Sequence, residues 1–111
     1  MARIVAFVPD LLFGSNVAGA LQAAGHEVQL VSALSSETDA DLVVVDLTAE
    51  PDARIAAVEQ ALKPETPKLA FYSHVEADVR ARALEAGLDL VVPRSRMARE
   101  GAALVDQLLG P

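Results

Sequence analysis

The sequence predicts an α/β domain, built as a doubly wound sheet of five parallel strands in the order 2-1-3-4-5 with helices on both sides. Two observations predict this fold. Five short runs of Val, Ile and Leu are continuous rather than alternating, which is typical of strands buried on both faces. Segments with helical spacing lie between most of these runs, and strands that alternate with helices form parallel sheets. The runs cover residues 4–8, 28–31, 42–45, 69–72 and 90–92.

Helices are expected after four of the five strands. Pro51 suits the first position of the second helix, and Gly25 and Gly87 end the first and the third. Each helix carries apolar residues three or four positions apart, which would face the sheet. The expected spans are about 10 or 15 to 24, 51 to 63, 74 to 86 and 96 to 109. Their apolar stripes are Phe13, Val17, Leu21 and Ala24; Ile55, Val58 and Leu62; Val75, Val79 and Leu84; and Met97, Gly101, Leu104, Val105 and Leu108.

The segment between the second and third strands departs from this plan. It reads SALSSETDA over residues 32–40 and has no helical stripe. The chain must there cross two strand spacings and return along the sheet, a straight path of about 20 Å. Nine extended residues reach about 30 Å, so a loop closes the connection. The second helix of the regular fold is therefore expected to be short or absent. The poorly covered sheet face leads to the hypothesis of a self-association surface and a homodimer.

Composition excludes several classes of protein. The chain has 111 residues and is expected to form a single domain over residues 1–111. Hydrophobic residues make up 52%, which excludes a disordered chain, and the absence of Cys excludes a disulfide scaffold. The net charge of 9 − 16 = −7 argues against nucleic acid as a partner. No apolar run approaches the roughly 20 residues that span a bilayer, so no membrane contact and a cytoplasmic location are expected.

Polar side chains follow the expected strands at their carboxyl ends. Parallel strands bring these ends to one edge of the sheet, where open α/β sheets carry their functional residues. Asp10, Asp46, Ser73, His74 and Arg94 are therefore expected at a common rim.

Around this rim the chain resembles the receiver domains of bacterial response regulators, the CheY-like members of the flavodoxin-like folds. The resemblance rests on the strand LVVVD ending at Asp46, on the hydroxyl of Ser73 after the fourth strand, and on the stretch GLDLVVPR ending at Arg94. It implies that Asp46 is the phosphoacceptor-like residue and that Ser73 and Arg94 are switch-like residues, with Tyr72 as a competing alignment for Ser73. It also implies a protein partner and a Mg²⁺ ion held by Asp10 and Asp46.

The sequence departs from the receiver pattern at two places. The acidic pair that holds Mg²⁺ in receivers aligns with Val8 and Pro9, and Asp10 comes one residue later. Mg²⁺ requires several oxygen ligands in near-octahedral geometry. Arg94 stands where receivers have Lys, which keeps the charge but not the compact ammonium group. These departures favour a stand-alone pseudo-receiver, a signalling and protein-interaction module without Mg²⁺-dependent phosphorylation and without catalytic residues. The alternative is a genuine phosphoacceptor domain of a phosphorelay, modified on Asp46.

Each site residue also has a structural interpretation. Asp46 ends a strand, Asp10 fits a helix cap, and the sequence from Ser73 to Glu76 fits a capping box.

Two further patterns suggest anion binding. The stretch from Gly14 to Asn16 would be a phosphate loop if the first helix began at Ser15, which would make the chain a flavodoxin-like binder of small anions. Arg94, Arg96 and Arg99 open the last helix, where cations oppose the helix dipole. That arrangement suggests that the three arginines bind an anionic patch on a partner, or a phosphate group.

Overall fold

The computed structural model describes residues 2–110 and has a single five-stranded sheet in these residues, in the order β2-β1-β3-β4-β5. All four pairings between neighbouring strands are parallel. The predicted strand order and direction are confirmed. The strands are β1 (Arg3–Phe7), β2 (Glu27–Val31), β3 (Leu42–Asp46), β4 (Lys68–Tyr72) and β5 (Leu90–Pro93).

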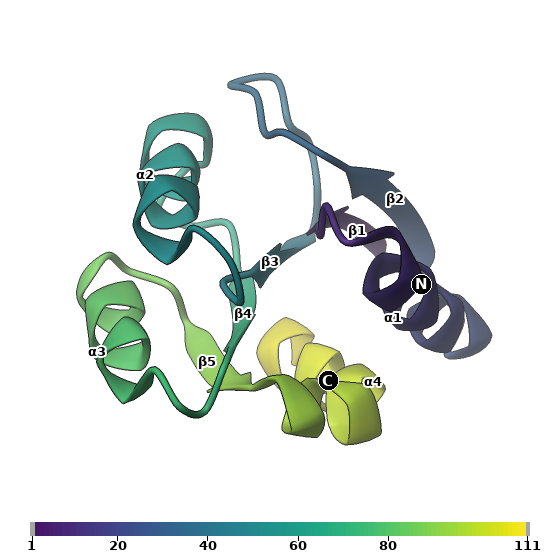
Figure 1. Cartoon of the computed structure of the whole chain (residues 1–111). Coiled ribbons are helices and arrows are strands. Elements are labelled where there is room, and N and C mark those ends of the chain that lie inside the picture. Colours follow the sequence, from purple (N-terminus) through teal and green to yellow (C-terminus); the bar gives the residue numbers. More distant parts are fainter. Residues whose placement is uncertain (1, 111) are drawn as a thin grey trace.

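Helices cover the two faces of the sheet in pairs (Figure 1). On one face lie α1 (Leu11–Ala23) and α4 (Arg94–Leu109), and on the other lie α2 (Pro51–Ala61) and α3 (Ala77–Glu85). Successive residues of β3 contribute to opposite cores: Val44 packs with α1 and α4, and Val45 packs with α2 and α3. Every residue of β3 and β4 is buried, which explains why these strands read as unbroken apolar runs.

No helix forms between β2 and β3, as predicted from the polar connection. Leu34 and Ala40 of this loop pack against the core on the side of α2 and α3. The prediction that all strands are buried on both faces is wrong for β2, where Glu27 and Gln29 are exposed. These polar positions interrupt the apolar character predicted for the strand, although Leu30 of the same strand is 39% exposed. The homodimer predicted for this place stays a prediction.

Helix α3 differs from the sequence prediction. It begins at Ala77 rather than near residue 74, and Val75 is 77% exposed instead of facing the sheet. The capping box at Ser73 is wrong, because the Glu76 amide donates to the backbone carbonyl of Ser73 and no side chain caps this helix. A turn therefore separates β4 from α3, and it leaves the Ser73 side chain available at the rim.

Helix α1 begins at Leu11, and the Asp10 carboxylate caps it by accepting the Phe13 amide at 3.0 Å. Gly14 therefore lies inside the helix, and the phosphate loop suggested for Gly14–Asn16 is wrong. Gly14 is buried where α1 approaches the sheet: a Cβ atom there would lie 3.1 Å from the Val8 carbonyl oxygen and 3.3 Å from a methyl carbon of Leu30.

Within the described residues, no helix combines the length and the apolar character that crossing a membrane requires.

Gly14 and Gly19 of α1 give a matched test of this packing. We expect Gly19→Ala to stabilise the protein by about 0.5–1 kcal/mol, because Ala is the better helix former and the site is open. Gly14→Ala should instead lower stability by about 1 kcal/mol or more, because the added methyl group meets the carbonyl oxygen of Val8, directly after β1. Urea unfolding of both variants measures the difference. Equal effects at the two positions would contradict the close approach of α1 to the sheet.

Candidate functional site

The carboxylate of Asp46 lies buried at the end of β3, with the residue only 3% exposed. Its Oδ1 atom accepts two hydrogen bonds from Thr48, one from the backbone amide at 2.8 Å and one from the hydroxyl at 2.5 Å. This turn follows from the spacing, because an aspartate accepts readily from the amide two residues further along. One oxygen of Asp46, the residue predicted to be phosphoacceptor-like, thus accepts two hydrogen bonds from Thr48.

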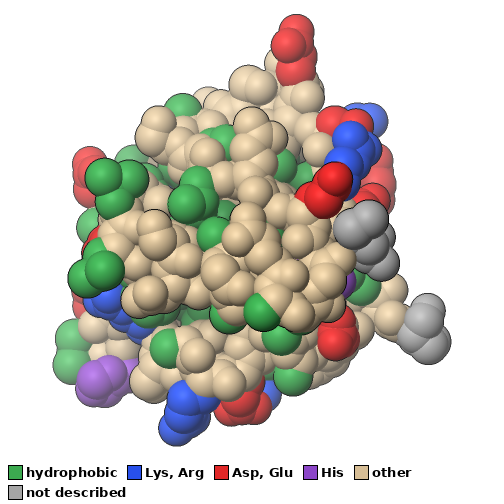
Figure 2. Space-filling model, turned by 90° about the vertical axis from the view of Figure 1, so that its right-hand side faces the viewer, with side chains coloured by type: hydrophobic (Ala, Val, Ile, Leu, Met, Phe, Trp, Pro, Cys, Tyr) green, Lys and Arg blue, Asp and Glu red, His purple; other side chains and the backbone are tan. Residues whose placement is uncertain are grey.

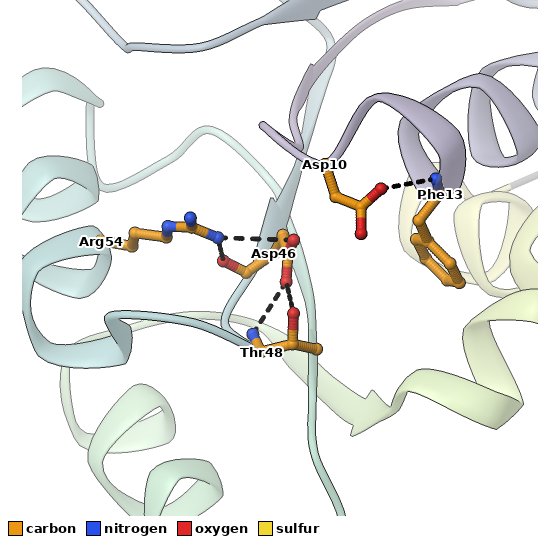
Figure 3. Close-up of polar contacts among 5 residues, drawn as sticks. All are labelled: Asp10, Phe13, Asp46, Thr48 and Arg54. Atoms are coloured by element: carbon orange, nitrogen blue, oxygen red, sulfur yellow. Dashed lines mark hydrogen bonds and ion pairs between the residues drawn. The ribbon is translucent and has the colours of Figure 1, made fainter.

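Arg54 approaches the same carboxylate from the first turn of α2 (Figure 3). Its Nη1 atom lies 3.4 Å from Asp46 Oδ2 and donates at 3.0 Å to the Asp46 carbonyl oxygen. The guanidinium carbon also lies 6.0 Å from the centre of the Phe7 ring. The Arg54 side chain is 13% exposed, so a fixed positive charge of the chain itself stands beside the buried carboxylate. The charge of the buried carboxylate is therefore offset by a group of the chain itself.

The residues predicted as metal ligands do not form a metal site. Asp10 is exposed and turns its carboxylate toward the Phe13 amide, and Asp46 is held by Thr48 and Arg54 (Figure 3). In residues 2–110 no group of three or more His, Cys, Asp or Glu side chains is placed to share one ion. Mg²⁺ binds through several hard oxygen ligands. The donor set present here does not fit it.

A pocket opens beside Asp46, between the turn after β4 and the start of α4. We call it the Arg94 pocket, and its volume is about 520 Å³. The structure thus brings the predicted residues Ser73, His74 and Arg94 together, whereas Asp46 lies behind Thr48 and does not line the pocket. The guanidinium carbon of Arg94 lies 4.3 Å from the centre of the Phe13 ring. The pocket is lined by Phe13, Thr48, Ser73, His74, Arg94, Ser95 and Ala98.

The three arginines at the start of α4 do not form one patch. Arg96 and Arg99 both reach Glu100, at 3.5 Å and 3.8 Å, while Arg94 lies in the pocket. A helix turns 100° per residue, so positions 96 and 99 share a side and position 94 points away from them. The predicted partner patch therefore divides into two arginines that share the single carboxylate of Glu100 and a separate arginine in the pocket.

Sequence reasoning missed three residues of this site: Thr48 and Arg54 as partners of Asp46, and Phe13 as the support of Arg94. A signal existed for Arg54, because it lies four positions before the core residue Val58 and so on the sheet-facing side of α2. Phe13 was predicted as a core residue. It is half-buried, and its ring packs on Phe71 with the ring centres 4.9 Å apart.

Comparison with solved structures gives a consistent answer on the fold. A CheY-like receiver domain protein from Methanospirillum hungatei matches with a TM-score of 0.81 and 18% identity, over 98% of this chain and 94% of that one. The chain has the receiver-domain fold. The receiver domain of a sensor histidine kinase from Pseudomonas aeruginosa, solved with a magnesium ion in its active-site cleft, matches with a TM-score of 0.80 and 13% identity, over 99% and 98% of the two chains.

Receiver folds of longer proteins match as well. NtrX from Brucella abortus has a TM-score of 0.79 and 18% identity; the match covers 97% of this chain and 26% of that one. No family model matches the sequence, and no curated protein matches it either. At these identities the similarity to receiver domains establishes the fold.

The Asp46–Arg54 pair should be coupled energetically. We expect Arg54→Met to cost about 2–4 kcal/mol of stability, because it leaves a buried carboxylate without its counter-ion. Asp46→Asn combined with Arg54→Met should cost at least 1 kcal/mol less than the sum of the two single changes, roughly the coupling of contacting residues. Chemical unfolding of the four proteins measures this.

Arg82→Met serves as the control for this cycle. Arg82 pairs with Asp52 and Asp78 on the surface, and its hydrogen bond lowers the pKa of Asp78 below the ordinary value. Solvent screens such exposed pairs, so a smaller loss is expected there. Additive effects of the Asp46 and Arg54 changes would show that the buried pair contributes nothing as a pair.

Proposed function

We propose that this protein is a pseudo-receiver: a signalling module that acts through contact with a protein partner and not through Mg²⁺-dependent phosphorylation of Asp46. The observation that carries this proposal is the Arg54 guanidinium beside the Asp46 carboxylate. Phosphoryl transfer to an aspartate needs a free carboxylate oxygen and a cation that neutralises the incoming phosphoryl group. Here both oxygens of the carboxylate have partners within the chain.

The position of Arg54 also opposes a metal ion. A guanidinium carries its charge permanently and cannot serve as a ligand. A divalent cation beside Asp46 would have to displace Arg54 or accept its repulsion. Val8 and Pro9 align with the receiver acidic pair, and the neighbouring Asp10 carboxylate is used as the cap of α1. This arrangement supports a domain in which the negative charge of Asp46 is balanced without an added ion.

The exposed apolar side chains support a protein partner. Leu11, Leu12 and Val75 are 82%, 76% and 77% exposed, and all three follow the carboxyl ends of strands, at the edge where Asp46 lies. Helix α1 carries no charged residue. The side of the molecule formed by α1 and α4 accordingly has its charged side chains mainly around the periphery (Figure 2). A helix without charged residues and exposed leucines are typical of a surface that contacts another protein. Because the chain has a net charge of −7, such an uncharged surface also avoids electrostatic repulsion of the partner.

A genuine phosphoacceptor domain is the second candidate. It is favoured by the place of Asp46 at the end of the central strand β3, and by the Ser73 and Arg94 side chains nearby. In this case a modified Asp46 would break its contacts with Thr48 and Arg54. Thr48 donates its hydroxyl hydrogen bond to Asp46 and also lines the Arg94 pocket. Displacement of Thr48 would therefore alter the surroundings of Ser73 and Arg94. A modification shifts a conformational equilibrium only if it favours one of the two states.

Reaction with acetyl phosphate separates the two candidates. The full chain is incubated with Mg²⁺ and acetyl phosphate, beside a receiver domain that phosphorylates itself under the same conditions, and intact mass is measured. We expect no phosphoryl adduct on the chain, because Arg54 and Thr48 occupy the carboxylate. The variant Pro9→Asp/Arg54→Met, which restores an acidic residue and removes the cation, should gain reactivity. A stoichiometric adduct on the unaltered chain that disappears in Asp46→Asn, but not in Asp10→Asn, would overturn the proposal.

A further inference from the structure

We propose that the free edge of β2 pairs with β2 of a second copy of this chain, so that two copies form an antiparallel two-fold dimer with one continuous sheet. The pairing involves neither Asp46 nor the Arg94 pocket, and it therefore does not rest on the pseudo-receiver proposal. Three features carry it: an unprotected edge, backbone groups that match those of a second copy, and an uncharged helix beside the edge.

The edge formed by β2 lacks the usual protection against strand pairing. β2 is an outer strand of the sheet, and its register with β1 runs over all five residues without a bulge. Natural edges are blunted by lysine, proline, bulges or very short strands. The sequence of β2, EVQLV, contains neither lysine nor proline. The opposite edge strand, β5, is shorter, with four residues, and ends in Pro93. The chain thus leaves β2 as the edge that can accept another strand.

The backbone groups at this edge match those of a second copy in one register. Successive residues of a strand direct their N–H and C=O groups to opposite edges. The Glu27 amide donates to the carbonyl of Ala2, so the odd-numbered residues of β2 face β1, and Val28 and Leu30 face outward. In an antiparallel pair, Val28 can exchange two hydrogen bonds with the partner's Leu30, while Gln29 lies opposite the partner's Gln29. This is the one antiparallel register in which both outward-facing residues of each copy find a partner.

The side chains at the edge suit the same register. Leu30 lies on the side of α1, close to Gly14, yet it is 39% exposed. Val28 lies on the same face of the sheet and is partly buried. Pairing would place the exposed part of Leu30 against the partner's Val28, and apolar side chains directly opposite each other stabilise a strand pair. The second copy therefore covers apolar surface that the single chain leaves in water.

Charge does not oppose contact at this edge. Glu27 is the only charged residue of β2, and in this register it lies opposite the partner's Val31 rather than opposite another carboxylate. Figure 2 shows this side of the molecule, with its charged side chains mainly around the periphery. Two chains of net charge −7 can therefore approach each other here with little direct repulsion.

Helix α1 would extend the contact beyond the strands. It packs on β2 and carries no charged residue. A two-fold axis perpendicular to the sheet places the α1 helices of both copies on the same face. Strands of a sheet are about 4.8 Å apart and a helix is about 10 Å wide, so these two helices would adjoin across the axis. Because each copy offers β2 only once, the pairing closes at two copies.

Analytical ultracentrifugation of the full chain tests the pairing. Two short edges form a small interface, and small interfaces are weak, so the protein concentration should run from about 1 µM to about 1 mM. We expect the mean mass to rise from that of the monomer toward that of the dimer as the concentration increases. A chain that stays monomeric over this range, or species larger than a dimer, would overturn the proposal.

Gln29→Lys separates edge pairing from general attraction, because the two-fold axis would place two lysines directly opposite each other. The change lowers the net negative charge of each chain, yet it should raise the dissociation constant of the dimer about fivefold. Gln60→Lys makes the same change of charge at an exposed position of α2, away from the edge, and should not weaken the dimer. Circular dichroism checks that both variants are folded. Equal weakening by both changes, or no weakening by Gln29→Lys, contradicts the pairing.

Amide hydrogen exchange locates the contact. The amides of Val28 and Leu30 become hydrogen-bonded in the dimer, so their exchange should slow as the protein concentration rises. The Gln29 amide already faces β1 and should change little. If the chain dimerises while the amides of Val28 and Leu30 exchange as fast as in dilute solution, the copies meet elsewhere and the proposal is wrong.

Discussion

The common direction of the five strands is the constraint on which the rest of the molecule depends. Because the strands are parallel, residues far apart in the chain leave the sheet at one edge. Asp46 follows three buried valines of β3, Ser73 follows β4, and Arg94 follows β5. None of these positions is close to another in sequence. Parallel pairing also needs crossovers on both faces, and these place α2 beside Asp46 and α1 beside Arg94.

Two charged residues are buried among residues 2–110, and groups of the chain itself balance the charge of each. Lys68 is 4% exposed, and its ammonium donates to the carbonyls of Lys63, Pro64 and Thr66. Asp46 is 3% exposed and is balanced by Thr48 and Arg54. A charge removed from water is costly unless it is paired or hydrogen-bonded. At Asp46 these contacts are the basis of the pseudo-receiver proposal, since both carboxylate oxygens have partners within the chain.

The first residues of the helices show where local sequence patterns were sufficient to predict a helix start and where they were not. Asp10 was one of two predicted starts for α1, and Pro51 was the predicted start of α2. Both helices begin at these signals, because each signal acts through neighbouring backbone atoms. Ser73 and Glu76 have the spacing of a capping box, yet the chain forms a turn with a backbone hydrogen bond, and the helix starts at Ala77. Val79 and Ala83 are the buried anchors of α3, and their packing against the sheet outweighs the local cap.

The amino-acid pattern alone determined the strand order, the absence of a helix between β2 and β3, and the presence of Asp46, Ser73 and Arg94 at one rim. These features depend on burial, chain length and strand direction, which the order of apolar and polar residues encodes directly. Only the tertiary structure decided the partners of these side chains. Arg54 reaches Asp46 and Phe13 supports Arg94 because the packing distance and rotation of α2 and α1 on the sheet bring them there. Such angles arise from the whole core, so no single segment of the sequence specifies them.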